Sequence, residues 1–230
     1  MANLSALFDK YDRLVLFDTE TTGLAYSRDE IIEFAAVVIE LQGGIPTVIQ
    51  EYDELISLTP GNVIPANIVK LTGITNEAVK ERGISKETLC RDIAGMLTEK
   101  TLLLAYNAHF DLSFLFYLLL RNGDPTILKG KDKLDLLTVY KDRHSYPHKL
   151  CNAIDVYKLS DKVVNSHRAV DDVLATFAVM LEMEKEKADL ECYVNLFGYH
   201  PTYGLEGKPI GSVTYKPQQY DPPVPLYTLG

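Results

Sequence analysis

The segment RLVLFDTETTGL, residues 13–24, joins an apolar run to a turn and carries two closely spaced acids. Its first part, residues 13–18, has the β-branched and aromatic content of a strand, and the TTG that follows predicts a turn. Side chains two positions apart on a strand point to the same face, so we expect the carboxylates of Asp18 and Glu20 to converge. Adjacent carboxylates repel each other unless a cation lies between them, and hard divalent ions such as Mg²⁺ or Mn²⁺ suit carboxylate oxygens. Residues 189–191 repeat this spacing without supporting context, so the pair alone is a weak signal.

The segments after this turn predict a sheet with covering helices. Residues 31–41 and 46–58 predict two more strands, and the Gly43-Gly44 turn between them favours an antiparallel pair. Helical spacing then runs from about residue 64 to residue 97, and residues 101–106 form an apolar run typical of an inner strand. Further helices are predicted over residues 111–121, 150–159 and 168–186, while residues 134–140 fit either a short strand or a helix start. This order predicts an α/β fold, with a mixed sheet of three antiparallel strands followed by parallel strands and flanked by helices.

The composition is that of a globular protein with a buried core. The 230 residues are 47% apolar and 24% charged, which suits one domain plus an appendage. The longest apolar run, residues 112–120, is about half of a membrane span, and no secretory signal is visible, so we expect a cytoplasmic protein that contacts no membrane. Three isolated cysteines suggest neither disulfides nor a zinc knuckle. The net charge of −9 argues against general electrostatic binding of nucleic acid. Any such contact must be local, and residues 129–149, with six Lys or Arg against three Asp, could follow phosphates or be a solvated surface.

We expect residues 1–188 to form one domain and residues 189–230 to form an extended C-terminal arm. The last 42 residues hold 6 of the 11 prolines and 6 of the 14 tyrosines but only 6 charged residues. Such a segment is unsuited to a long helix and carries too few charges for a typical disordered tail. It should therefore be ordered and packed on its own domain or on a partner. Its tyrosines should pack against the domain, with stacking on bases as the alternative. Exchange of the arm between two chains would make a homodimer.

A further acid lies where a predicted strand passes into a predicted helix. The motif is NAHFD, residues 107–111, directly after the apolar run of residues 101–106. Open α/β sheets present functional residues at this position, so Asp111 is a candidate site residue. Its alternative role is helix stabilisation, because an acid in the first turn caps the helix and suits its dipole.

The third candidate group is SHRAVDD, residues 166–172, at the entrance to the last long helix. Five residues of helix rotate by about 500°, so His167 and Asp172 cannot share a face if both are helical. We therefore expect His167 in the loop before the helix, with Ser166 or His167 itself near the cap. Asp172 should lie in the early turns and face inward, which sets a mobile imidazole beside a fixed carboxylate. Asp171 is one residue out of register and is expected to be a solvated acid.

These three motifs, in this order, resemble those of the DEDDh branch of the DEDD superfamily, the DnaQ-like 3′-to-5′ exonucleases. The family includes the proofreading epsilon subunit of bacterial DNA polymerase III and the exonuclease region of PolC. The resemblance spans about residues 14–183 and includes shorter matches at IIEFA (31–35), LTGIT (71–75) and LDLL (134–137). Tyr106 departs from the pattern, because many members have a histidine or a small polar residue there.

The resemblance implies an RNase H-like fold and hydrolysis of phosphodiester bonds assisted by two divalent cations, Mg²⁺ or Mn²⁺. The implied metal ligands are the four carboxylates of Asp18, Glu20, Asp111 and Asp172. His167 would be the general base on the attacking water, with a capping loop histidine as the alternative. The residues implied to bind the substrate's terminal nucleotide are Thr21, Thr22, Gly23 and Leu24, with Leu24 against a base, and also Asn107, for which a helix cap is the alternative.

From the resemblance we expect a 3′-to-5′ exonuclease that releases nucleoside monophosphates from the 3′ end of single-stranded DNA, in proofreading or repair, with a DNA polymerase as a candidate partner. One rival is the same chemistry on RNA, because contacts to the 2′-hydroxyl decide between the two and are not visible in a sequence. Another rival is a nonhydrolytic module that binds a polymerase through its arm. All four acids and His167 are present, which argues against an inactive relative.

Overall fold

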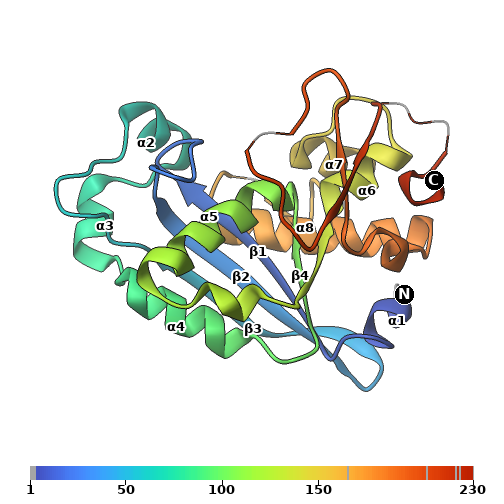
Figure 1. Cartoon of the computed structure of the whole chain (residues 1–230), viewed down its shortest axis with the longest axis horizontal. Helices are drawn as coiled ribbons and strands as arrows, with labels where there is room; N and C mark the ends of the chain where they lie inside the picture. The colour runs from blue at the N-terminus through green and yellow to red at the C-terminus, as the bar shows by residue number, and fades with distance from the viewer. Residues whose placement is uncertain (1–3, 165, 206, 221, 223, 230) are drawn as a thin grey trace.

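A computed structural model of the chain describes residues 4–164, 166–205, 207–220, 222 and 224–229 (Figure 1). Its centre is a five-stranded sheet in the order β3-β2-β1-β4-β5. The strands are β1 (Arg13–Thr21), β2 (Ile31–Gln42), β3 (Ile45–Leu55), β4 (Thr101–Ala105) and β5 (Asp132–Asp135). β1, β2 and β3 are antiparallel neighbours, whereas β4 runs parallel to β1 and β5 runs parallel to β4. The predicted sheet of three antiparallel strands followed by parallel strands is therefore confirmed.

The hairpin between β2 and β3 turns on two glycines. Gly43 and Gly44 have φ values of 60° and 83°, and two consecutive positive φ angles are what a tight type I′ hairpin turn requires. The predicted antiparallel connection at this Gly-Gly pair is confirmed.

Helices cover both faces of the sheet, and β1 alternates its side chains between two cores. Leu14 and Leu16 join the core that includes α8 (Ala169–Glu186), α6 (Leu136–Arg143), α7 (Leu150–Val156) and α1 (Ser5–Phe8). Val15 and Phe17 join the core that includes α4 (Lys86–Met96) and α5 (Ala108–Asn122). Figure 1 shows β1 between α5 on one side and α8 on the other. Continued beyond Phe17, the alternation turns the even-numbered residues of β1 toward α8 and the odd-numbered residues toward α5.

The region that periodicity left open, residues 134–140, contains both elements. β5 ends at Asp135, and α6 begins at the next residue. Asp135 makes this abrupt change possible, because its carboxylate accepts hydrogen bonds from the amides of Leu137 and Thr138, both at 3.2 Å. The short helix α1 was not predicted, whereas α2 (Ala66–Thr72) and α3 (Asn76–Arg82) fall within the predicted helical stretch.

The segment after α8 lies against the rest of its own chain. It contains η2 (Leu190–Tyr193), β6 (Leu196–Tyr199), β7 (Thr214–Pro217) and η3 (Leu226–Thr228), and β6 and β7 form a parallel pair. Asn195 is bonded twice to Lys133: its amide donates to the Lys133 carbonyl at 2.7 Å, and its side-chain oxygen accepts from the Lys133 amide at 2.9 Å. Arg143 pairs with Asp189 at the start of the segment. Lys133 is buried and the side chain of Arg143 is 7% exposed, so these two residues of the basic stretch 129–149 are structural and are not part of a solvated surface.

Within the described residues, no helix combines the length and apolar character needed to cross a membrane.

Candidate active site

The carboxyl end of β1 carries the first two acids on one face of the sheet. Asp18 and Glu20 alternate with the buried Thr19 and Thr21, as the strand period requires. This alternation places the carboxylates of Asp18 and Glu20 on the face of β1 that is turned toward α8.

Asp111 reaches the same strand end from the opposite face. It lies in the first turn of α5 and is buried. Its Oδ1 accepts hydrogen bonds from the Thr19 amide at 3.0 Å and from the Thr19 hydroxyl at 2.7 Å. The side chain is thus fixed between the strand and the helix, which a residue that only stabilised the helix dipole would not need.

The start of α8 brings the third motif to the site. Arg168 is the N-cap residue, so His167 lies in the preceding loop, as predicted, and Asp172 is buried in the first turn. Ligand atoms of Glu20, His167 and Asp172 all lie within 4.8 Å of one another. His167 has a φ of 58°, in the left-handed region that costs a non-glycine residue about 1–3 kcal/mol and that clusters at functional sites.

Ser166 and His167 lie just before the N-cap of α8, and Asn107 is the N-cap residue of α5, as predicted, but neither helix start has a side-chain cap hydrogen bond from these residues. The first amides of both helices instead donate hydrogen bonds to carboxylates that are distant in sequence. Glu33 on β2 accepts from the Ala169 amide at 2.7 Å, and Asp135 accepts from the amides of Asn107 and Ala108, both at 3.0 Å.

Glu33 and Asp135 are the site residues whose roles were not predicted. Glu33 is 0% exposed and also accepts hydrogen bonds from the Arg168 guanidinium, one of them from Nε at 2.7 Å. The signal for both residues was present in the sequence. Each is an acid inside an apolar strand segment, IIEFA for Glu33 and LDLL for Asp135, where a solvated charge has no place.

The acids perturb one another strongly. Burial and the neighbouring charges of Asp111, Asp172 and Glu20 raise the pKa of Asp18 well above its usual range. Burial raises the pKa of Glu20 to about 8, with the charges of Asp172 and Glu33 adding to the effect. Burial also raises the pKa of Asp111 to about 7, although its two hydrogen bonds from Thr19 act in the opposite direction. A cluster of this kind is unstable as bare anions at neutral pH, and a bound divalent cation would relieve it.

The turn after β1 is held from its two ends. Thr22 and Glu30 are bonded twice, from the Thr22 amide to the Glu30 carbonyl and from the Glu30 amide to the Thr22 hydroxyl, both at 2.9 Å. The Thr21 hydroxyl donates to the Gly23 carbonyl at 2.7 Å. Leu24, at the tip, is 81% exposed. An exposed leucine on a fixed turn beside the acids is free to contact a ligand.

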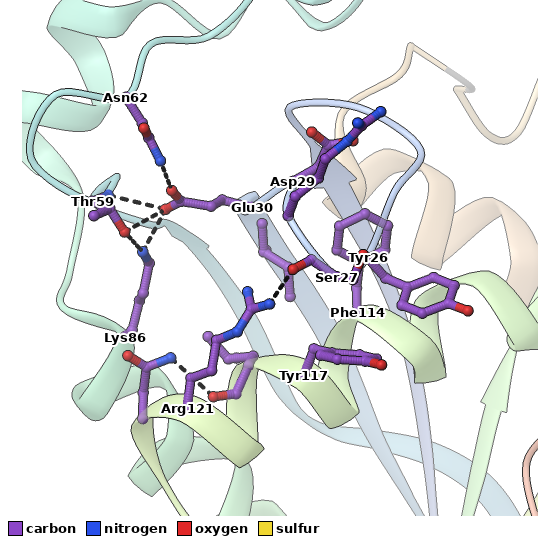
Figure 2. A pocket seen from close by; sticks show the side chains of 14 residues that line it. Tyr26, Ser27, Asp29, Glu30, Thr59, Asn62, Lys86, Phe114, Tyr117 and Arg121 are labelled. Carbon is purple, nitrogen blue, oxygen red and sulfur yellow. Dashed lines mark hydrogen bonds and ion pairs between the residues drawn. The ribbon is translucent and has the colours of Figure 1, made fainter. Parts of the chain in front are cut away.

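A pocket of about 340 Å³ lies behind this turn and shows how it is anchored (Figure 2). The Glu30 carboxylate accepts from Lys86, Asn62 and Thr59 on one wall. On the other wall the Arg121 guanidinium donates to the Ser27 carbonyl. The C-terminal segment reaches the same turn, because the Lys208 amide donates to the Tyr26 hydroxyl at 3.0 Å.

The fold and this site together define a class: an α/β domain that gathers acids from three segments at the end of its central strand. A family model for exonucleases, RNase T, matches residues 15–180. The chain therefore belongs to this exonuclease family, and the predicted DnaQ-like relationship is confirmed.

Curated relatives agree with this assignment. The PolC-type DNA polymerase III of Caldanaerobacter subterraneus is 32% identical over 173 residues, which cover 74% of this chain and 11% of that protein. The 3′-5′ exonuclease DinG of Bacillus subtilis is 34% identical over 179 residues, which cover 74% of this chain and 17% of that protein. This chain thus spans less than a fifth of the length of either relative.

Among solved structures, Escherichia coli exonuclease I in complex with a dA16 oligonucleotide superposes with a TM-score of 0.69 at 22% identity. The match covers 79% of this chain and 42% of that protein. The likeness confirms the expected RNase H-like exonuclease fold.

Proposed function

We propose that this chain hydrolyses the terminal phosphodiester bond at the 3′ end of single-stranded nucleic acid, with DNA preferred to RNA, and releases nucleoside monophosphates. The observation that carries the proposal is the convergence of Asp18, Glu20, Asp111, Asp172 and His167, from three separate segments, at the carboxyl end of β1. Relatives named as a PolC-type polymerase and as a 3′-5′ exonuclease support the direction of attack and the choice of DNA.

The residues present fit two divalent metal ions. The four carboxylates are hard oxygen donors, and the raised pKa values of Asp18, Glu20 and Asp111 show that burial and neighbouring negative charge disfavour their ionised forms. Asp18, Glu20 and Asp172 would hold one Mg²⁺ or Mn²⁺, and Asp18 and Asp111 would hold the other. When bound, such ions lower the pKa of the attacking water and stabilise the departing 3′ oxygen.

The remaining groups bind the substrate and move the proton. His167 takes the proton from the attacking water, and its place in the loop beside Glu20 and Asp172 leaves its ring exposed for this step. The turn of Thr21, Thr22, Gly23 and Leu24 holds the terminal nucleotide, with Leu24 against its base. Asn107 is exposed at the start of α5 and contacts the same nucleotide. A site that must surround a terminal nucleotide favours a single strand.

The test is digestion of 5′-labelled single-stranded DNA and RNA of one sequence with Mg²⁺ or Mn²⁺, against EDTA. We expect metal-dependent 3′-to-5′ digestion that is faster on DNA than on RNA and is abolished by Asp18→Asn and by Asp172→Asn. The matched control is Asp171→Asn, because this neighbouring acid bonds to the Ser166 hydroxyl and should leave digestion intact. Faster digestion of RNA would reverse the substrate preference. Full activity in the Asp18 or Asp172 variant would refute the site, and no cleavage of either polymer would refute hydrolysis.

A further inference from the structure

Four aromatic rings form a continuous line that joins two distant parts of the chain. Tyr146, between α6 and α7, lies 5.3 Å from Tyr220 of the C-terminal segment, measured between ring centroids. Tyr220 lies 4.5 Å from His200, and His200 lies 4.7 Å from Tyr203. Successive rings are tilted by 44°, 33° and 32°, which is closer to stacked than to edge-on. We name these four residues the aromatic ladder.

The two ends of the ladder are exposed although its middle is not. Tyr146 is 67% exposed and Tyr203 is 75% exposed, whereas Tyr220 and His200 are partly buried. The gaps between centroids match ordinary aromatic contact, so no base can insert between the rings. The free faces are therefore those of Tyr146 and Tyr203. Each is supported from behind by another ring, which holds it in place before any ligand arrives.

The ladder is attached to the proposed site. The Tyr106 hydroxyl donates to the His148 carbonyl at 2.7 Å, and Tyr106 directly precedes Asn107 at the start of α5. The His148 ring lies 5.8 Å from Tyr146 and 5.7 Å from Tyr220. Figure 1 shows the C-terminal segment, in red, beside α6 and α7. Tyr106 and His148 thus link the ladder to the segment between β4 and α5, which leads into the site.

We propose that Tyr146 and Tyr203 are a stacking subsite for bases of a single strand upstream of its 3′-terminal nucleotide. The inference rests on the proposed exonuclease function and assigns a role to part of the C-terminal segment, which the family motifs do not cover. Single-strand binding proteins use exposed aromatic rings in this way, because every base has a π-face and the contact tolerates any sequence. The chemistry suits a chain of net charge −9, which cannot hold a strand by general attraction to its phosphates.

Substrate length separates this subsite from the catalytic site. We would measure KM for oligothymidylates of 2 and 16 nucleotides with wild type, Tyr146→Ala and Tyr203→Ala. For the 16-mer we expect KM to rise between about 5- and 150-fold in each alanine variant, the range for loss of one stacked base. For the dinucleotide KM should be unchanged, since it is too short to reach the ladder. Tyr146→Phe and Tyr203→Phe keep the ring and should behave as wild type.

Phe116→Ala is the matched control for loss of an exposed ring, because Phe116 lies on α5 outside the ladder and is 42% exposed. Fluorescence anisotropy of a 5′-labelled 16-mer in EDTA supplies a readout that needs no hydrolysis. If the wild-type protein binds the 16-mer but cleaves nothing, the proposed function is refuted. The anisotropy of the alanine variants then decides whether Tyr146 and Tyr203 bind the strand. The stacking subsite would be overturned if the alanine variants had a KM for the 16-mer within twofold of wild type. If no cleavage occurs, a dissociation constant for the 16-mer within twofold of wild type would overturn it. So would a wild type that does not bind the 16-mer.

Discussion

The metal-free protein should lose stability as the pH rises, and Glu20→Gln should remove much of that loss. Burial and the charges of Asp172 and Glu33 raise the pKa of Glu20 from its ordinary value of 4.5 to about 8. Between these two values the folded state holds a proton that the unfolded state has released, so stability falls with rising pH across this window. Glutamine cannot ionise and carries no such dependence.

The size of the effect follows from the pKa shift. At about 1.4 kcal/mol per pKa unit, the shift corresponds to an upper limit of roughly 4 kcal/mol at pH 8. Glu20 is only half-buried, and solvent screening reduces this to an expected ~2 kcal/mol. For a domain of this size 1 kcal/mol changes Tm by about 2–4 °C, so we expect Glu20→Gln to melt roughly 4–8 °C above wild type at pH 8.

Thermal unfolding in EDTA at pH 5 and at pH 8 is the assay. At pH 5 the two proteins should melt together, because Glu20 is then protonated in the folded wild type. Mg²⁺ at pH 8 should raise the Tm of wild type more than that of Glu20→Gln. Glu51→Gln, on an exposed position of β3, is the matched control and should leave the pH dependence unchanged. Glu20→Gln melting at or below wild type at pH 8 would refute the reasoning.

Three further predictions follow from the contacts around the site. Glu33→Gln should cost about 2 kcal/mol of unfolding free energy in urea, below the roughly 3–5 kcal/mol for a broken buried ion pair, because Arg168 has a side chain that is 41% exposed and can be resolvated. His167→Ala should lower kcat at pH 7 by about 10²–10⁴, the range for loss of a general base, and should recover partly at higher pH as hydroxide replaces it. Gly23→Ala should raise KM by about tenfold, because its Cβ would lie 2.4 Å from Asp29 Oδ2 and must displace this carboxylate, which accepts a hydrogen bond from the Ala25 amide within the turn.

Each of these predictions has a distinct failure. An urea midpoint for Glu33→Gln equal to that of wild type would show that its ion pair does not order the start of α8. Undiminished kcat in His167→Ala at pH 7 would remove this residue from the chemistry. Gly95→Ala, on α4 with open space around its added Cβ, is the control for Gly23→Ala, and equal KM values in the two would show that the turn accommodates a side chain.

The central elements were predictable because their signals are local. A few residues are enough to predict each of three elements: β1 from its alternation, β4 from its apolar run, and the hairpin from Gly43-Gly44. Three motifs on such elements suffice to place the acids. The ends of helices were less predictable. Asn107 and Ser166 have the residue types of caps, but neither side chain bonds to the first amides of a helix, because the carboxylates that do so lie far away in sequence.

The C-terminal segment was beyond sequence reasoning for the same reason. Its composition predicts order but not which tyrosines pack and which remain exposed. Tyr193 is buried against Tyr227, at 5.0 Å between centroids, whereas Tyr203 faces solvent. That division depends on which residues the rest of the chain presents to each ring, and no local pattern encodes it.

The two functional helices share one device that explains why these acids can act together. α8 and α5 each begin at the site, and in each the first amides are satisfied by a carboxylate from a neighbouring strand, Glu33 for α8 and Asp135 for α5. The task of capping therefore does not fall to Asp172 or Asp111, although both lie in the first turn, where an acid is normally consumed by the helix end. Their carboxylates can instead face the end of β1. The buried carboxylates of Glu33 and Asp135 thus allow the acids of the site to cluster. Both residues are therefore needed for the site, although neither would itself contact the metal ions.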